Sequence, residues 1–363
     1  GYYNCLGRDG TIYSRLKHVW LQGRQVWMLA RLYHETDRFQ KPEILEAAVK
    51  GAEFLMKYAK NRETMKCYLV LTEDGKPVDV QRTIFSECFN VMGFSELSRA
   101  TGRKKYMEEA LKMMGKIVHW VYEDDTDLGK PKLVGKQHTS TMAVPMMLLC
   151  LIEQLETVDD SLAKDYEHLT KTCIKEILTH IQRNGTVVLE NVSPSGEELP
   201  GYDGRLMVPG HSIEAGWFLL RRIRKSGKSD MTNTIIESFI TKPFNVGWDS
   251  QHGGLFYFLD VDQHSPVQLE WDMKLWWPHN EALIAFLMAY KYTQNREYLE
   301  KFYAVFDFTF SHFVDSEHGE WYGYLSRRGE VSMDFKGGPW KGFFHLPRCL
   351  LMCEQMIRGL VSA

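Results

Sequence analysis

The chain has 363 residues, and its 44 Lys and Arg nearly balance its 47 Asp and Glu, which leaves a formal charge of −3. This balance argues against a large phosphate-binding surface, and we expect no nucleic-acid partner. Hydrophobic residues make up 44% and charged residues 25% of the chain, a composition typical of a globular protein and not of a disordered one.

The cysteine content and the hydropathy pattern bear on the compartment. Seven Cys occur without a Cys-x-x-Cys pair, which is too sparse for a disulfide scaffold and favours a reducing compartment. No run approaches the roughly 18 apolar residues expected of a membrane span, and no signal-peptide pattern is visible. We therefore expect a cytoplasmic protein without a membrane partner. The opening at Gly1, inside an expected strand, suggests a trimmed or processed N-terminus.

Helical periodicity dominates the chain. Apolar residues recur at spacings of three and four, as at Ala48, Ala52 and Leu55, with charged residues between them. The pattern predicts amphipathic helices approximately over 15–35, 42–60, 82–101, 104–122, 140–156, 163–182, 211–225, 231–243, 279–293, 297–314 and 346–360.

Between these helices lie segments rich in aromatic and β-branched residues, often with a hairpin signal such as Asp-Gly or Arg-Gly. They begin at Gly1, Cys67, Thr186, Gly253 and Glu320. The turn glycines 10, 75, 196 and 329 fit a repeat of about 60 to 66 residues, with weaker candidates near 131–135 and 261–266.

A repeat of this length holds two helices and a short hairpin, which is typical of helical-hairpin arrays. About six such units fit the chain. We therefore predict an all-α (α/α)6 barrel, or toroid, that forms a single catalytic domain over residues 1–363. An open solenoid is the alternative, but ten Trp residues favour an enclosed pocket lined by flat faces, as sugar sites often are.

The first motif of chemical interest is MVPGHSIEAGW at residues 207–217. Pro209 marks a helix start, which puts His211 near the N-terminal end and Glu214 on the same face. A helix N-terminus disfavours imidazolium, so His211 would be neutral near pH 7 and able to act as a base, with Glu214 fixing its tautomer or offsetting this effect. The alternative is a variant capping box in which Glu214 only serves the first turn.

The second motif is GGPWKGFFHLPR at residues 337–348. Pro347 fits the first turn of a helix, so His345 lies close to the N-terminus and Arg348 follows three residues later. The glycine and lysine spacing does not match a phosphate-binding loop. A sugar-facing loop with Trp340 as a stacking platform is the better interpretation, and a Gly/Pro-rich turn with buried aromatics is the alternative.

Two further segments complete the candidate set. KLWWPHNEAL at residues 274–283 again has a Pro at a predicted helix start, with Trp277 beside it and Glu281 in the first turn, where an acid equally complements the helix dipole. Near the chain start, Trp20, Arg24 and Trp27 share one helix face. Two indoles and a guanidinium suit a polyhydroxylated ligand, although a buried Arg paired with a carboxylate is an equal alternative. In a toroid these helix N-termini can converge on one rim.

At these residues the sequence resembles the N-acylglucosamine 2-epimerase family, also called renin-binding protein in animals. The resemblance covers nearly the whole chain, through NCLGRDG at 4–10, VWLQGRQVW at 19–27, GHSIEAGW at 210–217, KLWWPHNE at 274–281 and the 337–348 motif. It implies an (α/α)6 barrel, commonly dimeric. It also implies interconversion of N-acetyl-D-glucosamine and N-acetyl-D-mannosamine in the amino-sugar and sialic acid pathway.

The resemblance also implies the site residues. The essential arginines of the family match Arg24 and Arg348, its histidines match His211 and His345, and its glutamate matches Glu281. We add Glu214, Trp277 and Trp340 as substrate-binding candidates. Related cellobiose 2-epimerases carry a further His and Asn, and the stretch HTSTMAVP at 138–145 departs from that pattern, which argues against a cellobiose-type substrate.

Cofactors and partners follow from the same resemblance. It implies that ATP activates the enzyme without being consumed, although no motif here places that site, and that renin is a possible protein partner. We expect no cofactor for the chemistry and no metal.

The mechanism that follows is removal of the C2 proton from an open-chain sugar and its return on the opposite face. We predict His211 and His345 as the two bases, with Arg24 and Arg348 holding the developing oxyanion. We also predict that Glu281 or Glu214 orients a histidine or a hydroxyl. Three alternatives remain: a toroid glycoside hydrolase using carboxylates such as Glu214, Glu281 and Asp272, an aldose–ketose isomerase, and a non-catalytic renin-binding protein.

Overall fold

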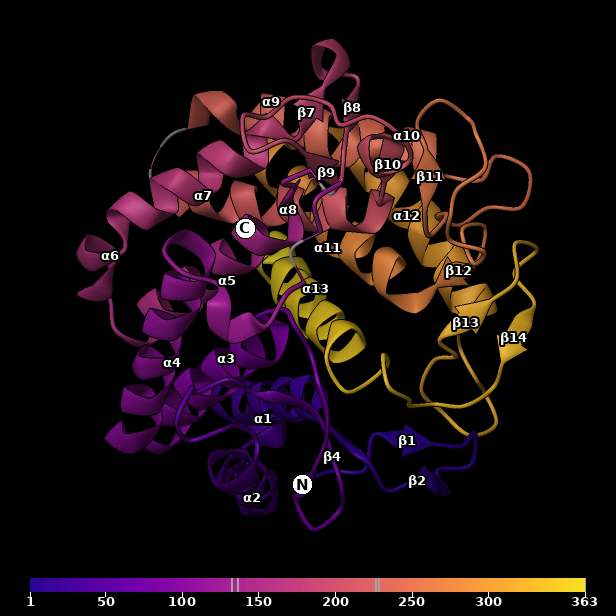
Figure 1. Cartoon of the computed structure of the whole chain (residues 1–363). Coiled ribbons are helices and arrows are strands. Elements are labelled where there is room, and N and C mark those ends of the chain that lie inside the picture. Colours follow the sequence, from indigo (N-terminus) through magenta and orange to yellow (C-terminus); the bar gives the residue numbers. More distant parts are fainter. Residues whose placement is uncertain (132, 136, 226, 228, 363) are drawn as a thin grey trace. The chain divides into compact units, whose positions relative to one another are not determined.

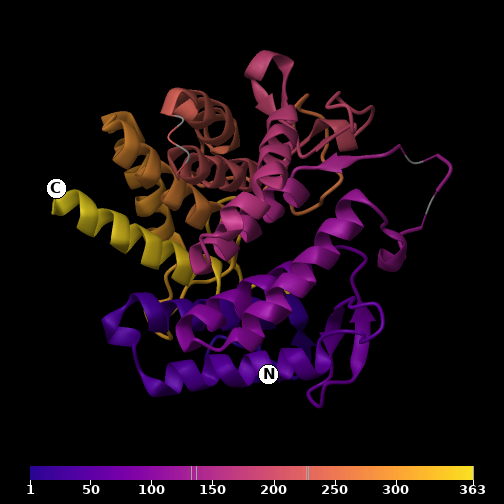
Figure 2. The same ribbon diagram turned by 90° about the vertical axis from the view of Figure 1, so that its left-hand side faces the viewer.

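Helices dominate the computed structural model, and its strands are two to four residues long (Figure 1, Figure 2). It describes residues 1–131, 133–135, 137–225, 227 and 229–362. The chain forms two compact units, and the prediction of a single domain over 1–363 stays a prediction. Unit 1 comprises Gly1–Lys136, Cys150–Tyr166 and Phe335–Phe344, and unit 2 comprises Gln137–Leu149, Glu167–Asp334 and His345–Ala363.

Unit 1 is built from helices joined by short antiparallel strands. Its helices are α1 (Val19–Glu35), α2 (Pro42–Tyr58), α3 (Phe85–Thr101), α4 (Lys104–Tyr122), the later part of α5 (Ala143–Val158) and α6 (Leu162–Asp165). Strand β1 (Cys5–Leu6) pairs with β2 (Ile12–Ser14), and a second sheet has the order β3 (Lys17–His18), β4 (Tyr68–Leu71), β5 (Pro77–Val80). The predicted helices over 42–60, 82–101 and 104–122 are confirmed. The first helix starts four residues later than predicted because Lys17 and His18 pair with β4.

The core of unit 1 lies where α1 meets α3. Every residue of α3 from Ser86 to Ser98 is buried, whereas α4 buries one stripe only. Glycines allow the close approach: a Cβ on Gly23 would lie 2.5 Å from the carbonyl oxygen of Phe89, and one on Gly93 would lie 2.9 Å from the oxygen of Gly23. The two helix backbones are therefore in direct contact.

Unit 2 is also helical. It contains α7 (Glu167–Thr179), α8 (Pro209–Lys225), α9 (Thr232–Ile235), a π-helical stretch (Ile236–Thr241), α10 (Lys242–Gly247), α11 (Trp276–Thr293), α12 (Arg296–His312) and α13 (His345–Val361). The strand pairs are β6 (Ser140–Thr141) with β9 (Asn191–Val192), β7 (Ile181–Gln182) with β8 (Val187–Val188), and β10 (Leu206–Met207) with β11 (Leu259–Asp260). A three-stranded sheet joins β12 (Lys274–Leu275), β13 (Tyr324–Leu325) and β14 (Val331–Met333).

Helix α11 is the centre of unit 2. It packs against α8, α12 and α13 (Figure 1), and all its residues from Trp276 to Ala289 are buried. Within the described residues, no helix has both the length and the apolar content needed to cross a membrane.

The hairpins around Gly10, Gly75 and Gly329 are confirmed as β1–β2, β4–β5 and β13–β14. The other two segments differ from the prediction. A turn does form at Gly196, but the strand before it, β9, pairs with β6, and the strand in the Gly253 segment, β11, pairs with β10. These strands take partners distant in the sequence, which local turn signals do not reveal. The weak candidate at 131–135 falls partly outside the described residues, and the one at 261–266 forms no strand.

Buried polar contacts hold the entry to α11. The Lys274 Nζ atom donates to Asp249 Oδ2 and to the Gly254 carbonyl, each at 3.2 Å. Burial alone would raise the pKa of Asp249, but hydrogen bonds led by that from Arg327 hold it at about 2. The fully buried His279 donates through Nδ1 to the Leu275 carbonyl and accepts the Leu255 N–H at Nε2, and burial lowers its pKa to about 3. His279 is therefore a neutral structural histidine.

The contact between α1 and α3 gives a stability prediction. We expect Gly23→Ala to lower the free energy of unfolding by about 1–3 kcal/mol, because its Cβ meets rigid backbone that cannot move aside. Gly115→Ala on α4 is the matched control: nothing lies within 4 Å of that Cβ, so the better helix former should stabilise the protein by about 0.5–1 kcal/mol. Urea unfolding of both variants checks the sign, and equal midpoints would contradict the close-contact explanation.

Candidate active site

Three helices of unit 2 bring six of the predicted site residues together. His211 is the third residue of α8 and Glu214 the sixth, so Pro209 opens that helix as predicted. His345 is the first residue of α13 and Arg348 the fourth, again as predicted. Helix α11 supplies Trp277 and Glu281.

One expectation about α11 was wrong. The helix begins at Trp276 and not at Pro278, because Leu275 belongs to a strand and the backbone turns helical directly after it. Glu281 therefore lies in the second turn, where its contacts are with side chains and not with the unpaired N–H groups of the first turn.

Arg348 joins two buried carboxylates. Its Nη2 atom lies 2.9 Å from Glu214 Oε1 and 2.5 Å from Glu281 Oε1. The Arg348 and Glu281 side chains are 4% and 0% exposed, so this is a desolvated ion cluster and not a surface pair. The Trp217 indole N–H donates to the other oxygen of Glu281 at 2.9 Å. Both oxygens of Glu281 thus accept hydrogen bonds, and Glu214 is a second carboxylate partner of Arg348.

His345 is oriented by Glu281. Its Nδ1 atom lies 2.7 Å from Glu281 Oε1. A carboxylate accepts hydrogen bonds, so Nδ1 carries the hydrogen, and Nε2 is the nitrogen at which a neutral ring can accept a proton. The predicted role of Glu281 in orienting a histidine is therefore supported by this contact.

His211 has a partner that the sequence did not indicate. Its Nδ1 atom lies 3.1 Å from both carboxylate oxygens of Glu190. The sequence suggested Glu214 for this role because it lies one turn along α8, but Glu214 bonds Arg348 instead. Glu190 lies 21 residues before His211, between β8 and β9, and only a non-local strand contact brings it there. No local signal in the sequence could have identified it.

The electrostatics of His211 also differ from expectation. Burial lowers its pKa, but the Glu190 carboxylate, and then Glu214 and Glu281, outweigh burial and raise the pKa above the ordinary histidine value. The helix N-terminus was expected to keep this ring neutral. Three carboxylates are the stronger influence, so they make protonation of His211 easier than for an ordinary histidine.

The two histidines share an aromatic neighbour. The Trp277 ring centroid lies 5.1 Å from that of His211 and 5.8 Å from that of His345. Tyr257 meets the same indole edge-on at 6.0 Å. The site therefore holds two histidine–carboxylate pairs, His211–Glu190 and His345–Glu281, and both histidines contact the same tryptophan ring.

The remaining predicted residues belong to unit 1. The Arg24 guanidinium carbon lies 4.1 Å from the ring centroid of Phe89, 4.9 Å from that of Phe344 and 5.1 Å from that of Trp20. Trp340 is 61% exposed and meets Trp20 edge-on at 4.9 Å. Sequence reasoning grouped Trp20 with Arg24 correctly, and the aromatic faces on Arg24 also come from residues it did not name.

Trp27 does not belong to this group of rings over Arg24. Its indole N–H donates to Gln154 at 2.9 Å, within a buried polar network that includes Arg31 and Glu96. It is therefore better explained as a core residue, which was the alternative considered for the Trp20–Arg24–Trp27 face.

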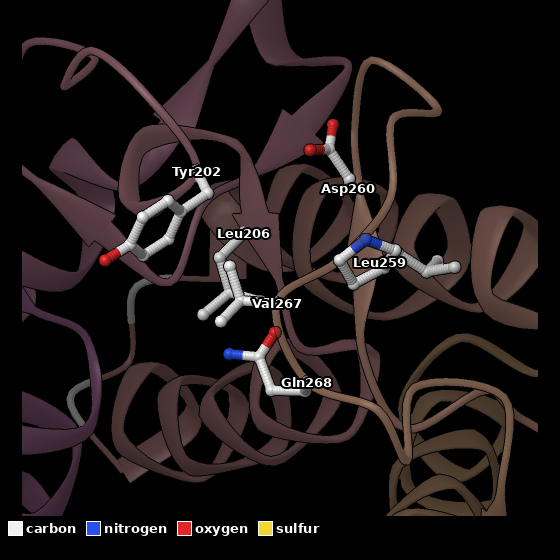
Figure 3. A pocket seen from close by; sticks show the side chains of 7 residues that line it. Tyr202, Leu206, Leu259, Asp260, Val267 and Gln268 are labelled. Carbon is white, nitrogen blue, oxygen red and sulfur yellow. The ribbon is translucent and has the colours of Figure 1, made fainter.

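A small pocket lies elsewhere in unit 2, between β10 and β11. It is lined by Tyr202, Leu206, Leu259, Asp260, Pro266, Val267 and Gln268. Figure 3 shows the Asp260 carboxylate directed away from Gln268, and the Arg205 Nε atom binds that carboxylate at 2.9 Å. The lining offers no histidine and no unneutralised acid, so the chemistry is better placed at the histidine pairs.

Glu214, Glu281 and His345 place ligand atoms within 4.8 Å of one another, a spacing that a metal ion can use. The Arg348 guanidinium already bonds both carboxylates, however, and would repel a second cation. This donor set is therefore better explained as an arginine site. That the enzyme uses no metal stays a prediction.

The sequence comparisons bear on what this site does. Residues 1–349 match the family model described as N-acylglucosamine 2-epimerase (GlcNAc 2-epimerase). The chain is 54% identical over 363 residues to the N-acylglucosamine 2-epimerase of Homo sapiens, covering all of this chain and 85% of the human protein. The chain belongs to the N-acylglucosamine 2-epimerase family. It is therefore a carbohydrate isomerase.

Solved structures agree on the fold. The cellobiose 2-epimerase of Spirochaeta thermophila DSM 6192 matches with a TM-score of 0.83 at 20% identity, covering 99% of this chain and 91% of that one. A D-mannose isomerase matches with a TM-score of 0.80 at 17% identity, covering 99% and 92%. The predicted fold class, an all-α (α/α)6 barrel with short β-hairpins, is confirmed.

The ion cluster of this N-acylglucosamine 2-epimerase family member gives a second prediction. Arg348→Met leaves the buried Glu214 and Glu281 without their shared cation, so we expect a loss of about 3–5 kcal/mol in the free energy of unfolding. Arg358→Met, on the same helix, is the matched control, because that side chain is 73% exposed and pairs with Glu354 at the surface. Its effect should stay within about 0.5 kcal/mol. Urea unfolding at neutral pH measures both, and similar losses would contradict the buried-cluster assignment.

Proposed function

We propose that the enzyme interconverts N-acetyl-D-glucosamine and N-acetyl-D-mannosamine at C2 by a two-base mechanism in which His211 and His345 exchange protons with the substrate. The observation that supports this most is the pair of histidine–carboxylate contacts around Trp277. Each contact fixes Nδ1 of one imidazole, and each imidazole then has Nε2 for proton transfer.

The chemistry explains why two bases suit this reaction. A C2–H bond is acidic only beside a carbonyl, so the sugar must react in its open-chain form. Inverting the configuration at C2 requires a proton to leave from one face and to arrive on the other. Two bases on opposite faces achieve this without rotation of the substrate, and each contributes about 10²–10⁴-fold to the rate.

One turnover balances as follows. The neutral imidazole takes the C2 proton, and the electrons of the broken C–H bond move into the sugar to form an enediolate with negative charge at O1. The imidazolium on the other face then gives its proton to C2, and the carbonyl forms again. The two histidines have exchanged protonation states at the end, and exchange with solvent resets them.

The other predicted residues have supporting roles in this proposal. Arg24 and Arg348 stabilise the oxyanion at O1. Arg348 also bonds two carboxylates, and the Arg24 guanidinium packs against the ring of Phe89. Trp340 is exposed and offers a stacking surface for the sugar.

The glycoside hydrolase alternative fits the observed contacts less well. A hydrolase of that kind needs one carboxylic acid protonated as a general acid. Glu214 and Glu281 both accept from the same arginine nitrogen, so neither is placed as a separate acid across a cleft, and the histidines would have no function. An aldose–ketose isomerase shares the enediolate and differs only in its product, so product analysis separates it.

Several expectations carried by the family resemblance remain predictions. They are activation by ATP, a homodimer, renin binding, membership of the sialic acid pathway and a cytoplasmic location. A non-catalytic renin-binding role predicts no turnover at all. Assays of the sugar reaction with and without ATP therefore test activation and this alternative together.

The third prediction concerns isotope uptake. In D2O with N-acetyl-D-glucosamine, early samples should show N-acetyl-D-mannosamine labelled at C2 and recovered substrate without label, because separate histidines remove and return the proton. Mass spectrometry and proton NMR measure both. His211→Asn and His345→Asn should each lose at least about 10²-fold in kcat. His119→Asn is the control, because that histidine pairs with Glu123 at the surface of unit 1, and it should keep full activity.

Three results would count against this proposal. Unlabelled product would exclude exchange with two solvent-equilibrated bases, and a labelled ketose would favour the isomerase. Retention of most activity in both histidine variants, with folding verified by circular dichroism, would exclude these residues as the bases.

A further inference from the structure

We propose that Glu190 is a positioning residue for the epimerisation: it fixes the Nδ1–H tautomer of His211 and makes His211 the histidine that carries the proton in the resting pair. This inference rests on the proposed two-base function. It adds a residue that neither the motifs nor the family resemblance identified.

The geometry of the contact supports the first half of the proposal. Both carboxylate oxygens of Glu190 lie 3.1 Å from His211 Nδ1, so the carboxylate faces that nitrogen with both oxygens. The Glu190 side chain is 11% exposed and that of His211 is 31% exposed. An ionised carboxylate only accepts, so Nδ1 must donate, and substrate chemistry at His211 takes place at Nε2.

The backbone around Glu190 is fixed on both sides. Its N–H donates to the Leu206 carbonyl at 2.9 Å, and its carbonyl accepts the Met142 N–H at 3.0 Å. Leu206 belongs to β10; α8 begins three residues after Leu206, at Pro209, and His211 follows two residues later. The short strand β10 therefore helps to position both Glu190 and His211.

The two histidine–carboxylate pairs are not equivalent, and this supports the second half. Within the described residues, the side-chain hydrogen bond of the Glu190 carboxylate is with His211 Nδ1. The Glu281 carboxylate is shared by His345, Arg348 and Trp217. Arginine already neutralises Glu281, so a proton gains more attraction on His211 than on His345.

The other acidic groups near His211 also favour its protonation, and Arg348 offsets part of their charge. Glu214 and Glu281 both attract a proton there, and both are bonded to Arg348. Trp277 and Tyr257 contribute uncharged surface, and the Tyr257 pKa is raised to about 12 by burial, with smaller contributions from Glu270 and Glu190, so the phenol is neutral. Glu190 is the carboxylate in direct contact with His211, and among the carboxylates it raises the His211 pKa most.

The fourth prediction compares Glu190→Gln with the wild type. The amide keeps the shape and removes the charge, so the His211 pKa falls and the pair loses its single proton at lower pH. We expect the basic limb of the kcat/KM profile, which reports the free enzyme, to move to lower pH. We also expect kcat/KM at neutral pH to fall about 10- to 100-fold, as for other groups that orient a catalytic histidine. The NMR titration of His211, assigned from the spectrum of His211→Asn, should move in the same direction.

Two further variants make the test specific. Glu190→Asp keeps the charge and should leave the basic limb closer to its wild-type position than Glu190→Gln does. Glu197→Gln is the matched control: it lies seven residues along the same segment, is exposed, and binds Ser195. Its profile and the His211 titration should be unchanged.

The outcomes separate this proposal from the proposed function. If Glu190→Gln loses activity but neither the limb nor the His211 titration moves, Glu190 is only structural and the proposal is overturned. If the wild type shows no epimerisation, the proposed function fails, and an unmoved His211 titration in Glu190→Gln would overturn the pairing independently. A shift of both the limb and the titration, with product-only deuterium uptake in the wild type, supports both.

Discussion

The hydrogen bond from an imidazole Nδ1 to a buried carboxylate is the contact on which the rest of this site depends. It occurs twice, at His211–Glu190 and at His345–Glu281. Each bond selects one tautomer, limits rotation of the ring and changes the cost of protonating it. Without it, a histidine near a helix N-terminus would rotate between solvent and sugar and would favour its neutral form. The helices provide the positions, and the carboxylates provide the orientation.

Burying the Glu214 and Glu281 carboxylates costs free energy, because both lose contact with water. Their shared bond to Arg348 offsets that cost. Two acids near one another in a site of low exposure would repel and take up protons. A guanidinium bonded to both offsets that repulsion, and Glu281 remains the hydrogen-bond acceptor of His345. Such clusters are weak sources of net stability, because desolvation offsets much of the attraction. Their retention here fits a requirement for orientation more than for stability.

Much of the fold was predictable from the sequence. The 3.6-residue periodicity and the prolines at helix starts gave α2, α3, α4, α8, α11 and α13 to within a few residues. The exception at α11, where Leu275 continues a strand up to Trp276, shows how a non-local sheet can move a helix start. The pairing of strands β9 and β11 could not be predicted, because their partners lie tens of residues away in the sequence.

The candidate site was also predictable only in part. His211, His345 and Arg348 could be found because each stands at a helix N-terminus marked by proline. A role of Glu281 in orienting a histidine was predicted, but its contact with Arg348 and its place in the helix were not. Glu190 could not be found, since it lies in an irregular segment whose position depends on backbone bonds to Leu206 and Met142.

The two-residue strand β10 has a wider consequence for how members of this family can diverge. Leu206 anchors the backbone of Glu190, and the chain reaches His211 five residues later. An insertion or deletion between Met207 and Pro209 would displace the acid from the ring while leaving every helix intact. The proton affinity of His211 can therefore change through the length of a connecting segment, without substitution of His211 or of Glu190.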